Sequence, residues 1–451
     1  MENRKNANTP KRRPEDCSRK PAAKSSVPQT RGKAQSNAKS AVSVRNSGTK
    51  KGTAPEEDKV LAALAHAKRQ RDKKKKSVAV FIICAVAVLS VIATIAGYLI
   101  WYKPSISDKP RFPTNVSGDE TGDDYVPTIQ SDFSRKDSVY NFLVIGIDRA
   151  ATQADVLMLV SFNAKEDTLN VVSIPRDTYI DAEGRSSHRI NAYLAGEYNL
   201  ATREGKDDPY VTAIENFVSM VESNLCVQID NYICMDTAGF RDIINALGGL
   251  DIDVPFDMEY EDPEQNLYIH LKAGPQHLNG EEAEQFVRFR KAYVTGDIGR
   301  ISAQKIFLTA LANQIKENLS IGVIAETVQV LMNYVTTDLS VLDAVYYAKE
   351  AYNVPLSSIR YVTMPGMGVR SPSGASFYVI YRANALHIVN KYLNVFTDDI
   401  SDGIFDSRNV FGNVGVSYID EVYQTPYQDL DEEVLSAEDV DKDSVYIPII
   451  E

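Results

Sequence analysis

One uncharged apolar run constrains this 451-residue chain more than any other feature. Val78 to Trp101 contains no Asp, Glu, Lys or Arg over about 24 residues, which as a helix would be about 36 Å long. That length exceeds the roughly 30 Å hydrocarbon core of a bilayer. A cleaved signal peptide has a shorter apolar stretch of about 7–15 residues near the start of the chain. We therefore expect a transmembrane helix over residues 77–102 that is retained in the mature protein.

Charge is distributed unevenly on the two sides of this run. Residues 1–76 hold 22 of the 49 Lys and Arg but only 7 of the 61 Asp and Glu, in a chain whose net charge is −12. The sequence KRQRDKKKK precedes the run and Trp101-Tyr102 follows it. Cationic residues mark the cytoplasmic flank of a span, and aromatic residues mark its interfaces. We expect a single-pass protein of the cell membrane, with its N-terminus in the cytoplasm and its main domain outside the cell.

The basic N-terminal segment, residues 1–76, is rich in Lys, Arg, Ser, Asn, Pro and Ala and nearly free of aromatic residues. It cannot bury enough apolar surface to offset the entropy of ordering, so we expect a disordered cytoplasmic tail. Its charge would suit nucleic acid phosphates or an anionic lipid leaflet. Because no aromatic side chains are interleaved for stacking on bases, we favour a membrane orientation signal and expect no nucleic acid partner.

Composition divides the external part into three segments. Residues 103–137 are rich in Pro, Gly, Ser and Asp, which predicts an extracellular linker that lifts the next domain off the membrane. Residues 138–397 alternate β-branched apolar runs with helical patterns, which predicts an α/β domain with a central mixed β-sheet flanked by helices. Residues 398–451 contain QDLDEEVLSAEDVDKDS and are expected to form an acidic, mobile tail.

Three apolar runs, YNFLVIGID, ADVLMLVSFN and TLNVVSIPRD, predict a strand meander within that sheet. Asp148 ends the first run and Asp155 begins the second, so antiparallel pairing would bring both carboxylates to one edge of the sheet. Two carboxylates can hold a Mg²⁺ ion that keeps its water and phosphate ligands, although aspartate near a turn is more often a capping residue. Arg176 closes the third run and can reach the same edge.

A second group of charged side chains lies in FVRFRKAYVTGDIGR, residues 286–300. Asn279 predicts the N-cap of a short helix just before it. If the backbone becomes extended near Val287, Arg288 and Arg290 point to the same side, since extended chain has a period of two. Two guanidinium groups would then face one target.

The same stretch continues into a predicted helix over residues 298–317. Asp297 is placed as its N-cap, and Arg300 and Gln304 follow at three- and four-residue steps on one face. Helix N-termini attract anions, and arginine binds phosphate bidentately. The stretch therefore suits a phosphorylated ligand; the alternative is an exposed, salt-bridged surface segment.

Seven motifs occur in an order and spacing that resembles the LytR-CpsA-Psr family of cell-wall glycopolymer transferases. They are NFLVIGIDR, ADVLMLVS, VVSIPRDTYI, HRINAYLAGE, INALGGLDIDV, LNGEEAEQFVRFR and GDIGRISAQ, and they cover most of residues 140–320. The resemblance implies a Mg²⁺-dependent, membrane-anchored phosphotransferase of Gram-positive-type bacteria. Such an enzyme takes a teichoic acid or capsular polysaccharide from a polyprenyl pyrophosphate carrier and attaches it to peptidoglycan.

The resemblance also implies roles for individual side chains. Asp148 and Asp155 match the metal-associated aspartates. The pyrophosphate-binding residues would be Arg176, Arg288, Arg290, Arg300 and Gln304. Catalysis would rest on Asp297, as a base or metal partner, together with Arg176, Arg288 and Arg290.

Two positions depart from the family pattern, because Gln153 and Ala303 stand where arginine is usual. The pyrophosphate clamp would then carry less positive charge, unless Arg149 or Arg185 supplies it. Three hypotheses follow: a glycopolymer ligase, a hydrolase of the lipid pyrophosphate, and a non-catalytic wall-binding or regulatory protein.

A polyprenyl tail would need an apolar slot of its own, since each buried CH₂ contributes about 0.8 kcal/mol. The segments IFLTALANQI and FVSMV offer apolar faces for such a slot, but core helices have similar faces. The sequence has no phosphate-cradling P-loop or Gly-x-Ser-x-Gly elbow. Cys226 and Cys234 could pair in an oxidising setting, or Cys234 could be a core side chain of the strand NYICMD.

Overall fold

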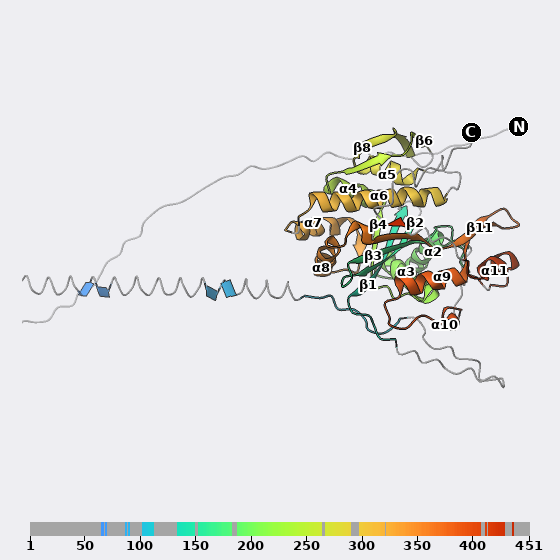
Figure 1. Ribbon diagram of the computed structural model, residues 1–451, viewed down its shortest axis with the longest axis horizontal. Coiled ribbons are helices and arrows are strands. Elements are labelled where there is room, and N and C mark those ends of the chain that lie inside the picture. The colour runs from blue at the N-terminus through green and yellow to red at the C-terminus, as the bar shows by residue number, and fades with distance from the viewer. Residues whose placement is uncertain are drawn as a thin grey trace, which may run out of the picture. The chain divides into compact units, whose positions relative to one another are not determined.

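The computed structural model describes part of the chain (Figure 1). The described residues are 65–66, 68–69, 86–87, 89–90, 102–111, 133–148, 152–182, 187–263, 267–289, 297–320, 322–406, 411–412, 414–428 and 435–436. Residues 1–92 and 93–451 are two separate units. Within these described residues, no helix has the length and apolar character needed to cross a bilayer. Most of the expected span, residues 77–102, lies outside them.

The second unit is built from strands and helices with short connections. Its strands are β1 (Val139–Asp148), β2 (Gln153–Asn163), β3 (Thr168–Ser173), β4 (Asn231–Asp236), β5 (Leu250–Val254), β6 (Met258–Asp262), β7 (Leu267–Leu271), β8 (Gly274–Leu278), β9 (Thr336–Thr337), β10 (Ile359–Thr363), β11 (Gly366–Arg370), β12 (Ser376–Ile380) and β13 (Leu435–Ser436). Its α-helices are α2 (Ile190–Glu204), α3 (Pro209–Leu225), α4 (Thr237–Ala246), α5 (Gly280–Arg288), α6 (Asp297–Asn318), α7 (Ile324–Leu331), α8 (Val341–Tyr352), α9 (Arg382–Ile388), α10 (Asp402–Asp406) and α11 (Ser417–Tyr423). Short 3₁₀ segments η2 (Met332–Tyr334) and η3 (Leu356–Ser358) and the π-helical turn η4 (Val389–Leu393) complete the list.

A seven-stranded sheet with the order β13-β10-β3-β2-β1-β4-β9 lies at the centre of this unit. β1, β2 and β3 pair antiparallel as a meander, whereas β4 runs parallel to β1 and β10 runs parallel to β3. The sheet is therefore mixed. The predicted α/β domain with a central mixed sheet and the predicted meander are both confirmed, whereas the transmembrane helix that was expected to precede the domain stays a prediction.

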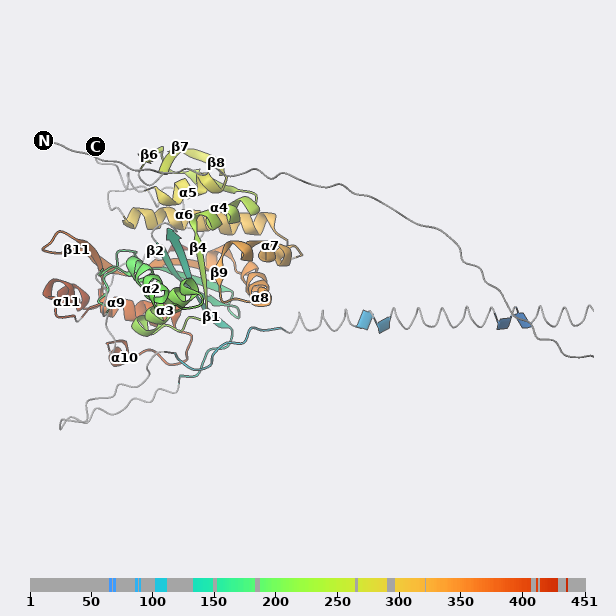
Figure 2. The ribbon, with the colours of Figure 1, turned by 180° about the vertical axis from the view of Figure 1, so that it is seen from behind.

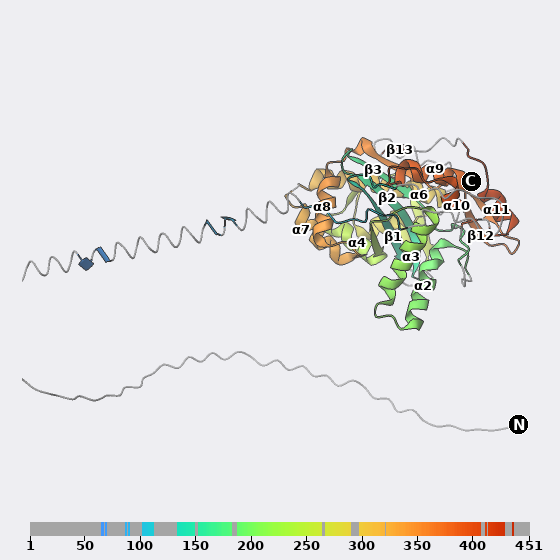
Figure 3. The ribbon, with the colours of Figure 1, turned by 90° about the horizontal axis from the view of Figure 1, so that it is seen from below.

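The two faces of the sheet bury alternate residues of β1, as expected for a strand covered on both sides. Leu143 and Ile145 are fully buried in a cluster with α2, α3 and α9. Phe142 and Val144 pack on the opposite face, against α8 and part of α6. Figure 3 shows α2 and α3 side by side, and Figure 2 shows α7 and α8 at the end of the sheet opposite α9 and α11.

A third hydrophobic cluster joins α4, α5 and α6 to two small antiparallel sheets, the strand pair β5–β8 and the strand pair β6–β7 (Figure 1). β5 alternates buried and exposed residues, because one face covers the helices and the other meets solvent. The predicted N-cap Asn279 is confirmed: its side chain accepts from the backbone N–H of Glu281 and Glu282, and Glu282 completes a capping box. Helix α5 thus begins at a fixed point beside α4.

The domain continues past the predicted boundary at residue 397. Ile400, Phe405 and Tyr423 are 1–2% exposed and belong to the same core as the central sheet. The β13 residues Leu435–Ser436 pair with β10 at the sheet's edge. The described residues 398–406, 411–412 and 414–428 are therefore part of the folded domain rather than a mobile tail.

Residues 102–111 also lie on the domain. The Tyr102 hydroxyl donates to Asp343 Oδ1 at 2.5 Å, and Ile106 packs against the cluster under α8. The Arg111 backbone N–H donates to Gln228 Oε1 at 2.9 Å. Residues 102–111 therefore pack on the domain rather than forming a free spacer, and the expected role of residues 103–137 in lifting the domain off the membrane stays a prediction.

Candidate functional site

A cavity of about 620 Å³ lies between the end of β1 and helices α4, α5 and α6. Its lining combines apolar side chains with charged or polar ones. These polar lining residues are Asp148, Asp155, Asp236, Thr237, Arg241, Glu284, Arg288 and Gln304. The cavity therefore has both an apolar part and a part that can hold an anion or a cation.

The two predicted metal aspartates meet at this cavity. In the β1–β2 pair Asp148 lies opposite Gln153, and a bulge after Gly146 leaves Asp155 in the irregular step. Bulges re-aim side chains and are frequent beside functional sites. Both carboxylates line the cavity. The prediction that antiparallel pairing brings them to one edge of the sheet is confirmed.

Arg176 reaches the same edge from the end of β3, as predicted. Its Nη1 donates to Asp155 Oδ1 at 2.8 Å, and the two side chains are 20% and 31% exposed. The guanidinium therefore offsets the charge of Asp155, and Arg176 is not among the residues that line the cavity.

Arg288 lines the cavity, but the backbone that positions it is helical and not extended as predicted. Helix α5 runs through Val287 and ends with Arg288, so the expected extended backbone near Val287 is wrong. Helical spacing instead places Arg288 one turn after Glu284, and its Nη1 donates to Glu284 Oε1 at 2.8 Å. Arg290 lies outside the described residues, so the predicted pairing of the two arginines stays a prediction.

Glu284 is only 8% exposed and holds a second arginine from α4. Its Oε2 is 3.2 Å from Arg241 Nη1. A buried carboxylate needs such partners because burial of an unpaired charge costs several kcal/mol. Arg241 and Arg288 thus converge on one carboxylate at the cavity wall.

Arg241 and Glu284 are site residues that were not predicted from the sequence. Arg241 follows Asp236, whose carboxylate caps α4 by accepting from the Gly239 N–H at 2.7 Å. Because β4 is parallel to β1, its carboxyl end lies at the same edge as Asp148. The sequence signal for Arg241 is its position: it lies near the start of α4, the helix that directly follows β4.

The first turns of α6 hold the remaining predicted residues. Gln304 is 8% exposed and lines the cavity, while Ala303 is fully buried in the cluster shared with the hairpins. Asp297 and Arg300 lie in the first turn of α6, and their side chains are outside the described set. Their roles stay predictions.

The site residues fit a magnesium ion. Among the described residues, no group of three or more His, Cys, Asp and Glu side chains could hold a metal. Mg²⁺, however, is commonly held by one or two carboxylates together with water and phosphate oxygens. Asp148 and Asp155 both line the cavity and could supply these two carboxylates.

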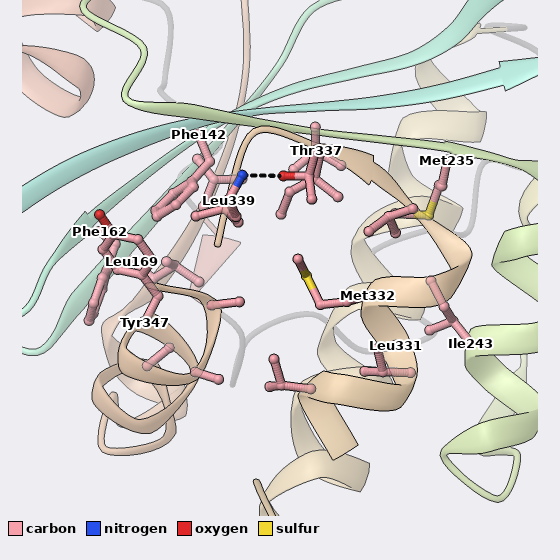
Figure 4. Close-up of a pocket in the computed structure, with 18 residues that line it drawn as sticks. Phe142, Phe162, Leu169, Met235, Ile243, Leu331, Met332, Thr337, Leu339 and Tyr347 are labelled. Atoms are coloured by element: carbon pink, nitrogen blue, oxygen red, sulfur yellow. Dashed lines mark hydrogen bonds between the residues drawn. The ribbon is translucent and has the colours of Figure 1, made fainter. Parts of the chain in front are cut away.

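A second cavity of about 370 Å³ lies between the sheet, α7 and α8 (Figure 4). Phe142 and Phe162 line it from the sheet, Leu331 and Met332 from α7 and η2, and Tyr347 from α8 (Figure 4). Its lining is otherwise apolar, and the one hydrogen bond drawn, from the Leu339 N–H to Thr337 Oγ1 at 3.1 Å, is internal.

The two cavities share three lining residues, Val144, Met235 and Ile243. They are therefore neighbours separated by single side chains. Burial raises the pKa of Tyr347 far above its usual value, so its hydroxyl stays neutral and adds no charge to the second cavity. A charged end and an apolar end lie next to each other.

Cys226 and Cys234 are both free and buried. Burial raises the pKa of Cys226 to about 12 and that of Cys234 to about 11. The alternative in which they form a disulfide is wrong, and the one in which Cys234 is a core residue of its strand is confirmed.

The fold and the two cavities define an α/β protein whose site suits an anionic group joined to an apolar tail. The chain belongs to the LytR_cpsA_psr family, which matches residues 113–393. It is 30% identical over 277 residues to the polyisoprenyl-teichoic acid–peptidoglycan teichoic acid transferase TagV of Bacillus subtilis (strain 168), over 59% of this chain and 68% of that protein. It is 27% identical over 323 residues to TagU of Bacillus cereus, which carries the same transferase name, over 70% of this chain and 97% of that protein. The crystal structure of B. subtilis TagV matches with a TM-score of 0.45 and 28% identity, over 56% of this chain and 95% of that one.

Proposed function

We propose that this chain is a transferase that attaches a glycopolymer, of the teichoic acid or capsular type, to peptidoglycan. The donor is a polyprenyl pyrophosphate-linked glycan, and the enzyme is anchored in the cell membrane with its domain outside. The observation that carries the proposal is the junction of a charged cavity with an apolar one, which share Val144, Met235 and Ile243. A lipid pyrophosphate has the same two parts.

The basic side chains of the charged cavity bind the pyrophosphate in this proposal. Arg241 and Arg288 both face the cavity and are held by Glu284, so their positions are set before the ligand arrives. Gln304 can donate its amide N–H to a phosphate oxygen. Phosphoryl transfer asks the protein mainly to position the groups and to stabilise oxygens that gain charge in the transition state.

Asp148 and Asp155 would hold the Mg²⁺ ion in this proposal. The bound ion neutralises phosphate charge and orients the pyrophosphate. Arg176 orients Asp155 through its 2.8 Å contact. Asp297 is the proposed base for the acceptor hydroxyl.

The polyprenyl tail occupies the apolar cavity. Of the two candidate segments, IFLTALANQI contributes Phe307, Leu308 and Leu311 to the neighbouring charged cavity, not to the apolar one, and Leu308 packs on the same face of the sheet as α8. The segment FVSMV instead belongs to the core under the opposite face of the sheet, where Phe217 is fully buried. The tail therefore lies on the α6–α8 side of the sheet.

Two observations weaken the hypothesis that too little positive charge at the pyrophosphate site makes the protein non-catalytic. Ala303 points into the hydrophobic cluster beneath α5, so this position does not face the cavity. Arg241 adds a positive charge that the sequence analysis had not counted. A catalytic site is thus favoured over a non-catalytic wall-binding protein.

The test uses the purified full-length chain in detergent with a synthetic polyprenyl pyrophosphate-linked glycan and a peptidoglycan oligomer, with and without Mg²⁺. Lipid phosphate release and glycan attachment are measured together. Mg²⁺-dependent attachment that Arg288→Ala abolishes and the surface control Arg203→Ala retains supports the proposal. Phosphate release without attachment identifies a hydrolase instead, and tight lipid binding without either product identifies a binding protein.

A further inference from the structure

Four large apolar side chains are exposed on α7 and α8, two helices that pack against each other. Val323 and Val330 are 39% and 46% exposed, and their seven-residue spacing puts them on one face of α7 and its N-cap. Val341 and Leu342 are 45% and 42% exposed in the first turn of α8, which packs against α7. We call these four residues the α7–α8 apolar face. Exposed apolar patches mark binding surfaces more often than single exposed residues do.

The chain that leaves the expected membrane span is fastened beside this face. Tyr102 directly follows the apolar run that ends at Trp101. Its hydroxyl donates to Asp343 Oδ1 at 2.5 Å, and Asp343 is the next residue after Leu342. No spacer therefore separates the end of the expected span from the first turn of α8.

The attachment continues along the following residues. Ile106 packs against the cluster beneath α8, and Arg111 donates its backbone N–H to Gln228. Arg135 also donates to the Ser107 carbonyl at 3.0 Å. The segment after the span thus runs over the domain surface instead of forming a free spacer.

We propose that the α7–α8 apolar face lies on the outer surface of the membrane and inserts its side chains among the lipid headgroups. This inference rests on the membrane anchor of the proposed function. Tyr102 lies next to the expected span, where aromatic side chains favour the membrane–water interface. Transfer of valine and leucine side chains out of water is favourable. Residues that line the apolar cavity, among them Leu331 and Ala348, come from the same two helices. A lipid tail can then pass from the bilayer into the cavity between α7 and α8 without crossing bulk water.

The bilayer is favoured over a second copy of the chain as the occupant. The Tyr102 attachment brings this face to the membrane in every molecule, at any protein concentration. A stable dimer buries at least about 1,200 Å² in total, and four side chains at roughly half exposure supply only a small part of that area.

The test is fluorescence quenching by lipids brominated near the headgroup, with the full chain reconstituted in nanodiscs that hold one copy each. Trp101 is the only tryptophan, so the wild-type chain reports the depth of the anchor. In a Trp101→Phe background, Val330→Trp and Leu342→Trp report the α7–α8 apolar face. Both are expected to be quenched to an extent comparable with Trp101.

Two control positions have the same exposure but lie elsewhere on the domain. Tyr268→Trp on β7 and Met367→Trp on β11, where the native side chains are each 45% exposed, are expected to show no quenching by brominated lipid. Quenching at 330 and 342 no greater than at these controls overturns the proposal. An unquenched Trp101 in the wild-type chain overturns the anchor itself. Burial of both probes without bromine quenching assigns the face to another protein surface and also overturns it.

A second measurement does not depend on tryptophan probes. The double variant Val330→Asn, Leu342→Asn should lower turnover of a lipid-linked donor embedded in vesicles by at least about fivefold, while turnover of the same donor dispersed in detergent stays unchanged. Equal turnover in vesicles by the double variant and the wild type contradicts membrane docking through this face.

Discussion

Glu284 and Arg288 lie one helical turn apart on α5, and their side chains meet at 2.8 Å on the wall of the charged cavity. The second carboxylate oxygen of Glu284 is 3.2 Å from Arg241. Glu284 is 10% exposed at its side chain, so little water competes for these contacts. An anionic ligand must therefore share the two guanidinium groups with a carboxylate that is part of the protein.

Replacing Glu284 by Gln should strengthen binding of a polyprenyl pyrophosphate. Glutamine keeps the shape and one oxygen acceptor but removes a negative charge close to the phosphates. At a separation of about 6 Å near a protein surface such a charge costs on the order of 1–3 kcal/mol, so we expect Kd to fall by about fivefold to 150-fold. Calorimetric titration of the full-length chain measures it, with the exposed Glu281→Gln as control. Weaker binding would mean that the carboxylate mainly orients the arginines.

Replacing Arg241 by Ala should weaken binding of the same ligand. The variant removes a donor at the cavity wall and leaves Glu284 with one fewer partner. Because Arg241 is 42% exposed, we expect a loss of about tenfold in affinity, and Arg241→Lys should recover part of it. Arg203→Ala, at the exposed end of α2, should match the wild type. An Arg241→Ala variant with unchanged Kd would exclude this residue from the site.

Much of this site follows from local patterns in the sequence. Asp148 and Asp155 flank a short turn between two apolar strands, and this pattern fixes their shared edge through pairing geometry. Asn279 and Glu282 form a capping box that marks the start of α5. Such signals act within a few residues, so one sequence is sufficient to find them.

The rest depends on contacts between distant segments. Whether α5 stops at Val287 or at Arg288 depends on the packing of α4 and α5, not on local preference. Glu284 and Arg241 are far apart in the chain, and only the fold brings them together. The acidic composition after residue 397 predicted a mobile tail, although apolar residues such as Tyr423 pack into the core there.

Removal of Mg²⁺ should abolish transfer, because the phosphates would then lack their main counter-charge. Chelation with EDTA should stop glycan attachment, and added Mg²⁺ should restore it. Asp148→Asn should raise the Mg²⁺ concentration for half-maximal rate by about tenfold, since one of two carboxylate ligands is lost. Asp207→Asn, at an exposed turn between α2 and α3, is the matched control. Full activity in EDTA would remove the metal from the mechanism.

Replacing Gly280 by Ala should destabilise the contact between α5 and α4, the two helices that carry Arg288 and Arg241. A Cβ at this position would overlap the backbone oxygen of Arg241, and backbone cannot move aside as a side chain can. We expect the free energy of unfolding to fall by about 1–3 kcal/mol and the affinity for lipid pyrophosphate to fall as α5 shifts away from α4. Gly368→Ala, where nothing lies within 4 Å, should leave both unchanged. An unaltered melting temperature for Gly280→Ala would show that the two helices can separate freely.

Replacing Glu222 by Gln should stabilise the domain increasingly as pH rises. Burial is the largest cause that raises the pKa of Glu222 above its usual 4.5, against the lowering effect of the Ile229 N–H and of Arg111. The folded state therefore holds this proton more tightly than the unfolded chain does. The stabilisation is present below pH 4.5 and is lost as pH rises through the folded pKa. Glutamine keeps an oxygen for the Ile229 N–H, which donates to Glu222 Oε1 at 2.8 Å, and has no charge to bury.

The measurement is the melting temperature of the wild type, Glu222→Gln and the exposed control Glu215→Gln between pH 4 and pH 8. The difference between Glu222→Gln and the wild type should grow in favour of the variant above about pH 4.5 and level off at higher pH. The control should run parallel to the wild type, because its carboxylate is already in water. A Glu222→Gln curve that also runs parallel, or that falls below the wild type as pH rises, would mean that the ion pair with Arg111, at 3.4 Å, outweighs the cost of burying the carboxylate.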